Sequence, residues 1–184
     1  MPENIEIKAR AKDFSRQCQL AQQASGSSGE IILQEDTFFD VARGRLKLRI
    51  LSASQGELIY YERIDVAVPR KSEYYVAQSS TPKSLETVLC ATLHVRGTVK
   101  KRRTLYKAGQ TRIHMDEVEG LGCFIELEVV LERGQDEAEG MRIAREFMDR
   151  LEIAEEDLLA QAYVDLLMSA TDSKIRDSKF EIRD

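Results

Sequence analysis

The sequence predicts an α+β fold built on one antiparallel β-sheet. Stretches in which apolar and polar residues alternate recur along the chain, and this period of two is typical of strands with one buried face. Short turns separate many of these stretches, which favours antiparallel pairing between neighbours. Amphipathic segments, with apolar residues three or four positions apart, are inserted at intervals and predict helices that pack on the sheet.

The length of 184 residues suits one domain with a core of its own. We expect this domain to span residues 1–169 and a polar tail to cover residues 170–184. The net charge of −5 gives no general attraction to nucleic acid or to an anionic membrane, so we expect neither as a partner. Affinity for an anion must instead come from a local cluster of bases.

The three cysteines are odd in number and far apart, at positions 18, 90 and 123. This spacing gives no disulfide framework and no pair of metal ligands, and it indicates a reducing compartment. No apolar run approaches the roughly 20 residues of a membrane helix, and the N-terminus does not resemble a signal sequence. We therefore expect a soluble cytoplasmic protein, and its oligomeric state stays open.

The alternating stretches predict strands at residues 4–10, 30–40, 45–51, 57–68, 74–78, 95–106, 111–118 and 122–132. The segment 69–71, which begins with a proline, is predicted to break the chain between the fourth and fifth of these strands. Helices are predicted at residues 12–24, 82–93, 134–151 and 155–168. Thr81 is expected to cap the second helix, with Pro82 at its first position. The polar residues from Ser169 onward are expected to fray.

Two of the predicted strands carry rows of a single charge. In the last strand, Ile125 and Leu127 fall on one face, whereas Glu126 and Glu128 fall on the other. The strand that starts at Arg45 repeats the arrangement with the opposite charge, because its odd positions are cationic and its even positions are apolar. A face exposed to water usually mixes both signs along each strand. The rows therefore favour a binding site on the polar face of the sheet.

Alternate residues of a strand lie on the same face, so the odd or even position of a residue (its strand parity) predicts which face it occupies. Strand parity assigns two sets of charged side chains to this polar face. The basic set is Lys8, Arg45, Lys47, Arg49, Lys101, Arg103 and Arg112, with Arg63 as a further candidate, and the acidic set is Glu6, Asp116, Glu126 and Glu128. A closed or strongly curved sheet would gather both sets inside one cavity. Bases two residues apart can present donors to successive phosphates, and carboxylates at the same spacing can hold Mg²⁺ or Mn²⁺. The pattern fits a polyphosphate with a bound divalent metal.

A solvated sheet face is the alternative interpretation. Charges on such a face make cross-strand pairs that contribute little to stability. The alternative would be preferred for one strand, whereas matched rows on several strands weaken it, and parity alone leaves both interpretations open. His114 shares the face of Asp116, but it is not preferred as a site residue. The sequence contains no P-loop, GxSxG or HExxH motif, which excludes the mechanisms that depend on them.

Five short motifs follow one another at residues 4–8 (NIEIK), 44–49 (GRLKLR), 99–103 (VKKRR), 116–122 (DEVEGLG) and 124–128 (FIELE). Each is modest alone, but their order and spacing are specific. Together they resemble the CYTH superfamily, the triphosphate tunnel metalloenzymes that include class IV adenylyl cyclases and thiamine triphosphatases. The resemblance runs from Asn4 to about Leu167. Residues 34–39 and 58–63 make the chain similar to the bacterial subgroup labelled class IV adenylyl cyclase.

This resemblance implies an eight-stranded antiparallel β-barrel with surrounding helices, whose charged interior is a triphosphate tunnel. It implies a metal site for Mg²⁺ or Mn²⁺ formed by Glu6, Asp116, Glu126 and Glu128. It implies that a triphosphate is held by Lys8, Lys47, Arg49, Lys101 and Arg103. Parity adds three further substrate-binding candidates, Arg45, Arg63 and Arg112. The candidate catalytic residues are Lys8, Arg49, Lys101 and Arg103.

Two positions depart from the family pattern. The family opens with Glu-x-Glu-x-Lys, and here Asn4 replaces the first acid, which keeps an oxygen ligand but removes a charge. Tyr61 stands where many members have a lysine, with Arg63 as the candidate substitute. These departures bear on activity more than on fold.

Three functions remain open. The first is metal-dependent hydrolysis of an inorganic or organic triphosphate, and the second is cyclisation of ATP to cyclic AMP and pyrophosphate. The third is non-catalytic binding of a nucleotide or polyphosphate, which the loss of an acid at Asn4 favours. Hydrolysis ranks first because cyclisation needs an adenine pocket, which the sequence does not identify. In each case the expected partner is a small molecule that contains a triphosphate, such as inorganic triphosphate or ATP.

Overall fold

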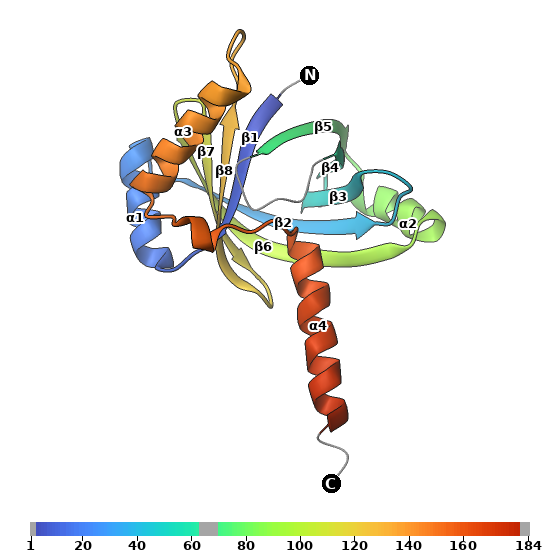
Figure 1. Ribbon diagram of the computed structural model, residues 1–184. Helices are drawn as coiled ribbons and strands as arrows, with labels where there is room; N and C mark the ends of the chain where they lie inside the picture. The colour runs from blue at the N-terminus through green and yellow to red at the C-terminus, as the bar shows by residue number, and fades with distance from the viewer. Residues whose placement is uncertain (1–2, 63–69, 181–184) are drawn as a thin grey trace.

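The computed structural model describes residues 3–62 and 70–180. Eight strands close into an antiparallel barrel in the order β1-β5-β4-β3-β2-β6-β7-β8, with β8 paired to β1 (Figure 1). The strands are β1 Glu3–Arg10, β2 Glu30–Phe39, β3 Arg45–Ser52, β4 Gln55–Glu62, β5 Arg70–Ser79, β6 Val95–Ala108, β7 Thr111–Val118 and β8 Gly122–Val130. The predicted barrel with surrounding helices is therefore confirmed.

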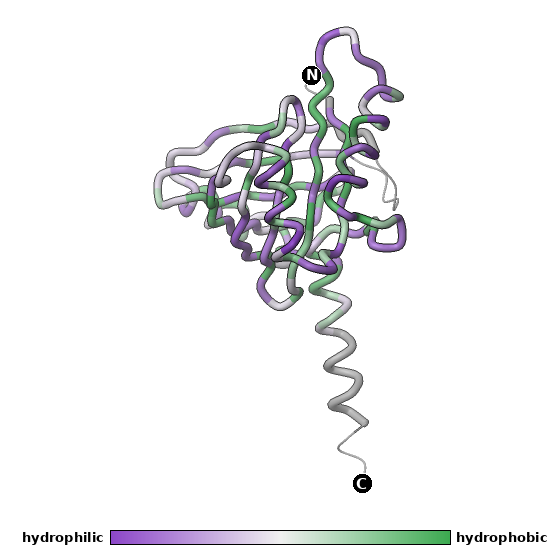
Figure 2. The backbone as a smooth tube through the Cα atoms, turned by 90° about the vertical axis from the view of Figure 1, so that its left-hand side faces the viewer, coloured by the Kyte–Doolittle hydropathy of each residue, from purple (hydrophilic) through white to green (hydrophobic). Residues whose placement is uncertain are grey.

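The alternation of residues along each strand separates the barrel interior from its outer wall. Along the tube of Figure 2, hydrophilic and hydrophobic residues follow one another in the strands. On β3, Leu48 and Ile50 point outward and pack with Leu85 and Leu89 of α2 (Pro82–Thr92). Lys47 and Arg49, at alternate positions of β3, face inward, because neighbouring residues of a strand lie on opposite faces.

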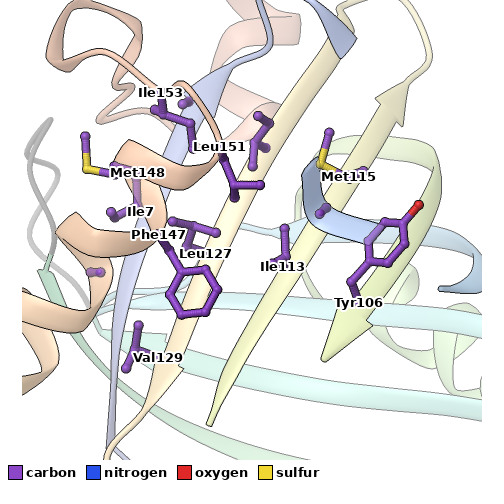
Figure 3. Packing of buried hydrophobic residues seen from close by; sticks show 14 of the residues in the cluster. Ile7, Tyr106, Ile113, Met115, Leu127, Val129, Phe147, Met148, Leu151 and Ile153 are labelled. Atoms are coloured by element: carbon purple, nitrogen blue, oxygen red, sulfur yellow. The ribbon is translucent and has the colours of Figure 1, made fainter. Parts of the chain in front are cut away.

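The largest core cluster lies between the barrel wall and helices α1 (Phe14–Ser25) and α3 (Glu137–Arg150). Ile7, Met115 and Leu127 contribute to it from β1, β7 and β8, and Phe147 contributes from α3 (Figure 3). A side chain at Gly140 of α3 would meet Ile5 of β1, since a Cβ there would lie 2.6 Å from Ile5 Cγ1. This close approach fixes α3 against the outer wall of the barrel.

The ends of α1 and α3 follow from local capping. Asp13 accepts a hydrogen bond from the backbone N–H of Arg16 at 3.0 Å, and α1 ends at Gly26, whose φ of 66° lies in the left-handed region. The carboxylate of Asp136 accepts from the backbone N–H of Glu139 at 2.9 Å. This cap makes α3 begin at residue 137, three positions after the predicted start.

Helix α4 (Tyr163–Phe180) corrects the prediction for the C-terminal part. The helix predicted to begin at residue 155 is represented by a short 3₁₀ turn, η1 (Glu155–Asp157), followed by an extended link. The carboxylate of Asp165 accepts from the backbone N–H of Ala162 at 3.2 Å, so the helix starts later. It continues past Ser169 to Phe180 and projects away from the barrel (Figure 1). The division at residues 169 and 170 stays a prediction.

Strand β5 is longer than the predicted strand at residues 74–78. It begins at Arg70 and includes Lys71, within the segment that was expected to break the chain. The reason is a long-range pairing, because Ile5 of β1 lies opposite Lys71 and Glu6 lies opposite Arg70. The second half of the strand predicted at residues 57–68 lies outside the described residues. None of the described helices has the length and apolar character needed to cross a membrane.

Candidate functional site

The barrel interior holds a cavity of about 590 Å³, a size that suits a small ligand. The described cationic side chains that line it are Lys8, Lys47, Arg49, Lys101, Arg103, Lys107 and Arg112. The described acidic side chains that line it are Glu6, Asp36, Glu57, Glu126 and Glu128. Bases therefore outnumber acids on the described lining, which favours a ligand with several negative charges.

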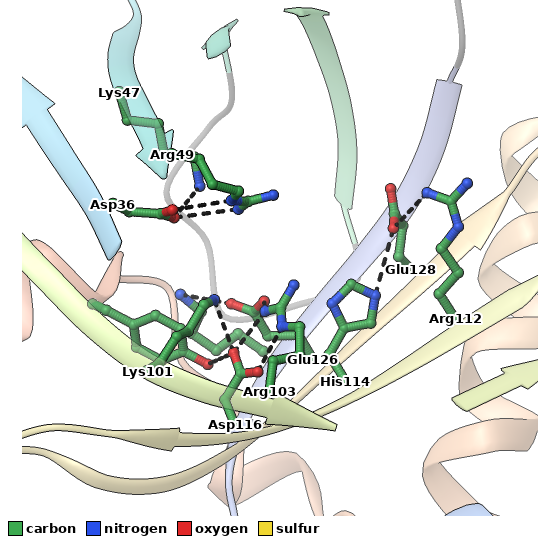
Figure 4. Close-up of polar contacts among 12 residues, drawn as sticks. Asp36, Lys47, Arg49, Lys101, Arg103, Arg112, His114, Asp116, Glu126 and Glu128 are labelled. Carbon is green, nitrogen blue, oxygen red and sulfur yellow. Dashed lines mark hydrogen bonds and ion pairs between the residues drawn. The ribbon is translucent and has the colours of Figure 1, made fainter. Parts of the chain in front are cut away.

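A first group of charges lies on β2 and β3, around Asp36 (Figure 4). Asp36 accepts from Lys47 Nζ at 2.8 Å, from Arg49 Nε at 3.0 Å and from Arg49 Nη2 at 3.2 Å. Burial raises the pKa of Asp36, but the charges of Lys47 and Arg49 outweigh burial and hold the pKa far below its usual value. Burial and the neighbouring Arg49 lower the pKa of Lys47 to about 8.

A second group lies on β6, β7 and β8, around Asp116, which is fully buried. Arg103 donates to Asp116 from Nε and from Nη2, at 2.6 Å each, and Lys101 Nζ donates at 3.0 Å. Burial raises the pKa of Asp116, but the charges of Arg103 and Lys101 outweigh burial and hold the pKa at about 2. Asp116 is therefore an anion that orients two bases toward the cavity.

Glu126 joins this second group from the cavity side. Its carboxylate contacts Arg103 Nη2 and lies 3.2 Å from Lys8 Nζ. Burial raises the pKa of Glu126, yet the charges of Lys101, Lys8 and Arg103 hold the pKa well below its usual value. The carboxylate is therefore ionised, and it lies beside bases that line the cavity.

A third group surrounds Glu128. Its Oε1 accepts from Asn4 Nδ2 at 2.5 Å, and its Oε2 accepts from Arg112 Nη1 at 3.2 Å. His114 Nε2 lies 3.7 Å from Oε2 of Glu128, and neither ring nitrogen of His114 has a hydrogen-bond partner among the described residues (Figure 4). Burial and the nearby charge of Arg103 hold the pKa of His114 well below its usual value, so the imidazole is neutral.

Tyr163, the first residue of α4, forms part of the cavity lining. Its hydroxyl donates to Asp116 Oδ2 at 3.1 Å. Lys8 Nζ lies 3.7 Å from the centre of the Tyr163 ring, and Lys101 Nζ lies 5.0 Å from the same centre. Burial raises the pKa of Tyr163 well above its usual value, so the hydroxyl keeps its proton.

The structure brings most of the predicted site residues together. The cavity is lined by Lys8, Lys47, Arg49, Lys101, Arg103, Arg112, Glu6, Glu126 and Glu128. Asp116 lies beneath the bases, with no exposed surface. Arg45 pairs with Asp165 of α4, its Nη1 lying 2.9 Å from Asp165 Oδ2, and it is not on the cavity lining. Arg63 lies outside the described residues.

Several residues of the site were not identified from the sequence. Lys107 is in phase with Lys101 and Arg103 on one strand, so parity alone is a signal that could have found it. Asp36 is in phase with Ile32 and Phe38, and this mixed row gave no charge signal. Tyr163 gave no sequence signal either. It lies on α4, far from the strands in sequence, and only the fold brings it to the barrel.

The oxygen donors of the cavity fit a hard divalent cation in chemical type. Glu6, Glu126 and Glu128 line it, and Asn4 Oδ1 is buried without a hydrogen-bond partner among the described residues. Within residues 3–62 and 70–180, however, no three His, Cys, Asp or Glu side chains are arranged to hold a metal ion. Binding would thus require Glu126 to turn away from Lys8 and Arg103, and Glu128 to turn away from Arg112.

Comparison with known families and curated proteins gives one match. The family model described as the CYTH domain matches residues 2–163, which is most of the chain. Curated proteins give no match. The matched region contains the whole barrel and ends at Tyr163, where α4 begins.

Solved structures share the fold. The PH1012 protein from Pyrococcus horikoshii has a TM-score of 0.77 at 24% identity, over 89% of this chain and 99% of its own. A protein from Vibrio parahaemolyticus, proposed to be an adenylate cyclase, has a TM-score of 0.65 at 19% identity, over 90% and 97%. HpAC1 from Hippeastrum, proposed to be an adenylyl cyclase and found to have a dominant triphosphatase activity, has a TM-score of 0.63 at 15% identity, over 92% and 96%.

Proposed function

Because the chain belongs to the CYTH domain family, we propose that it is a divalent-metal-dependent phosphohydrolase that acts on inorganic or organic triphosphates in the barrel cavity. One observation carries the proposal: bases on β1, β3 and β6 converge on a cavity of about 590 Å³. Their carboxylate partners hold them in place before any ligand arrives. Phosphoryl transfer needs mainly positioning and neutralisation of charge, which such a set can supply.

Each group of charges has a part in this proposal. Lys47 and Arg49 bind phosphate oxygens from β3, while Lys101 and Arg103 bind them from β6. Lys8 joins them from β1. As the bond to the departing phosphate breaks, these cations stabilise the negative charge that develops on it. Lys8, Arg49, Lys101 and Arg103 are the candidate catalytic residues among these bases, and they act through charge and position.

The proposed metal ligands are Glu6, Asp116, Glu126 and Glu128. Three of them line the cavity, and a bound Mg²⁺ or Mn²⁺ would neutralise part of the phosphate charge there. Asp116 would first have to give up the hydrogen bonds it accepts from Lys101 and Arg103. Asn4, in place of an acid, lowers the negative charge available to the cation and favours weaker metal binding than a further carboxylate at this position would give.

Cyclisation of ATP is the second candidate, and one feature of the cavity favours it. Apolar and aromatic side chains line part of the wall on β4 and β5, namely Ile59, Tyr61, Tyr74 and Val76. Such a surface can stack against or enclose a nucleobase. The same fold carries a dominant triphosphatase activity in HpAC1 from Hippeastrum, so hydrolysis is compatible with this architecture.

Product analysis with ATP separates these functions. The protein is incubated with ATP and Mg²⁺ or Mn²⁺, and all products are resolved. We expect orthophosphate and ADP, which supports hydrolysis. Cyclic AMP with pyrophosphate would overturn the hydrolase and support the cyclase. Binding of ATP or inorganic triphosphate without turnover would identify a non-catalytic binder.

A further inference from the structure

We propose that Tyr163, the first residue of α4, is a positioning residue that holds two of the phosphate-binding bases, Lys8 and Lys101, in place. This inference rests on the proposed function and adds a residue from outside the barrel strands. Three contacts of one aromatic side chain carry it. They join α4 to three strands of the barrel, β1, β6 and β7.

The ring of Tyr163 faces both lysines. Lys8 Nζ lies 3.7 Å from its centre and Lys101 Nζ lies 5.0 Å from it, both within the range of a cation–π contact. All three side chains are nearly buried, with 5%, 5% and 7% of Tyr163, Lys8 and Lys101 exposed. The negative face of the ring therefore stabilises two neighbouring positive charges where water cannot. Two ammonium groups gathered in this way present paired donors to one phosphate group.

The hydroxyl of Tyr163 has a separate effect, on Asp116. Asp116 Oδ2 accepts from Tyr163 at 3.1 Å, from Lys101 at 3.0 Å and from Arg103 at 2.6 Å. When Lys101 and Arg103 turn toward a phosphate, the neutral hydroxyl can stay on the buried carboxylate. The carboxylate then keeps a donor and its position while the bases act on the ligand.

The position of Tyr163 is fixed from the side of α4. Phe124 of β8 packs against the ring, with ring centres 4.9 Å apart, and Val164 lies in the same buried cluster. Asp165 Oδ2 lies 2.9 Å from Arg45 Nη1, and Asp165 Oδ1 lies 2.7 Å from Arg96 Nη2. These pairs attach the first turn of α4 to β3 and β6. The ring is therefore held rigidly enough to set the positions of the lysines.

Binding of inorganic triphosphate tests this role, measured by calorimetry without added metal and by steady-state turnover with it. Tyr163→Leu removes the ring face, and we expect the Kd to rise about tenfold and the KM to rise with little change in kcat. Tyr163→Phe keeps the ring and loses only the hydroxyl. We expect this conservative variant to restore binding to within about threefold of the unaltered protein.

Val164→Ala is the matched control, because it removes packing from the same cluster and leaves the aromatic ring. We expect its thermal stability to fall and its Kd to stay unchanged. If Tyr163→Leu does not fold, Tyr163→Met keeps more of the buried volume, also lacks an aromatic face and is judged by the same criterion.

Three different results would overturn the inference. If the unaltered protein does not bind inorganic triphosphate, the proposed function fails and the role of Tyr163 fails with it. If the unaltered protein binds and Tyr163→Leu binds equally well, the role of Tyr163 alone is wrong. An equal loss of affinity in Tyr163→Leu and Val164→Ala would also overturn it, since the effect would then be one of general packing.

Discussion

Arg103 and Asp116 form a buried bidentate ion pair, with Nε of Arg103 2.6 Å from Oδ1 of Asp116 and Nη2 2.6 Å from Oδ2. They lie directly opposite each other on β6 and β7, and neither side chain is more than 6% exposed. A buried charge left without its partner is costly. The pair therefore stabilises the barrel and also fixes the guanidinium at the cavity, so one carboxylate serves fold and site together.

The stability of the barrel should depend on this carboxylate. Asp116→Asn leaves Lys101 without its anionic hydrogen-bond partner and Arg103 with Glu126 alone, and we expect unfolding free energy to fall by about 3–5 kcal/mol. The measurement is urea denaturation followed by circular dichroism. Glu117→Gln is the control, because Glu117 is the next residue of β7 and pairs with Arg102 on the exposed outer face. We expect the control to change stability by less than about 1 kcal/mol. Equal losses in the two variants would contradict the account.

Bases that face inward should bind triphosphate, and the base between them should not. Lys101→Ala and Arg103→Ala each remove a charged donor from the cavity, and we expect each to raise the Kd for inorganic triphosphate by about 10- to 100-fold. Arg102→Ala removes the base between them, which is on the outer face. Its Kd should stay within about twofold of the unaltered protein. The Kd values are measured by calorimetric titration. Similar Kd values for the three variants would contradict the proposal that the inward-facing bases bind the triphosphate.

Alternation along the chain predicted the strands and their antiparallel sheet, and the resemblance to the CYTH superfamily implied that the sheet forms an eight-stranded barrel. On β3 and β8 the apolar rows pack outward, and Lys47, Arg49, Glu126 and Glu128 of the charged rows face the cavity, as parity predicts. Parity could not reveal which side chains of other elements contact the residues of these rows. Asp36 acquires its role only because β2 pairs with β3 in a register that places it opposite Arg49. Tyr163 likewise becomes part of the site only through the docking of α4, and Arg45 is held by Asp165 of that helix.

Turnover should depend on Glu126 and Glu128, the proposed metal ligands on β8. The double variant Glu126→Gln, Glu128→Gln keeps side-chain size but removes two negative charges, so we expect turnover to be abolished and metal binding to weaken. Metal binding is measured separately, as the rise in melting temperature on addition of Mn²⁺. Glu117→Gln serves again as the control on the outer face. Persistent turnover in the double variant would show that the metal assignment is wrong.

Triphosphate binding should weaken as pH rises through the pKa of Lys47. That pKa is lowered to about 8 by burial and by the charge of Arg49, so the ammonium form predominates below this value and is lost above it. We expect the Kd of the metal-free protein to rise between about pH 7 and pH 9. Lys47→Arg keeps its charge over this range and should remove that part of the pH dependence. An identical pH profile in both proteins would contradict the role assigned to Lys47.

The central claim is that the barrel cavity binds triphosphates and hydrolyses them with the help of a divalent metal. Product-resolved incubation with inorganic triphosphate, ATP and thiamine triphosphate tests it most directly, each with Mg²⁺, with Mn²⁺ and with a chelator. The account predicts release of orthophosphate from at least one substrate, dependent on metal and lost in Arg103→Ala. Absence of turnover with all three substrates, or orthophosphate release that persists in the chelator, would contradict it.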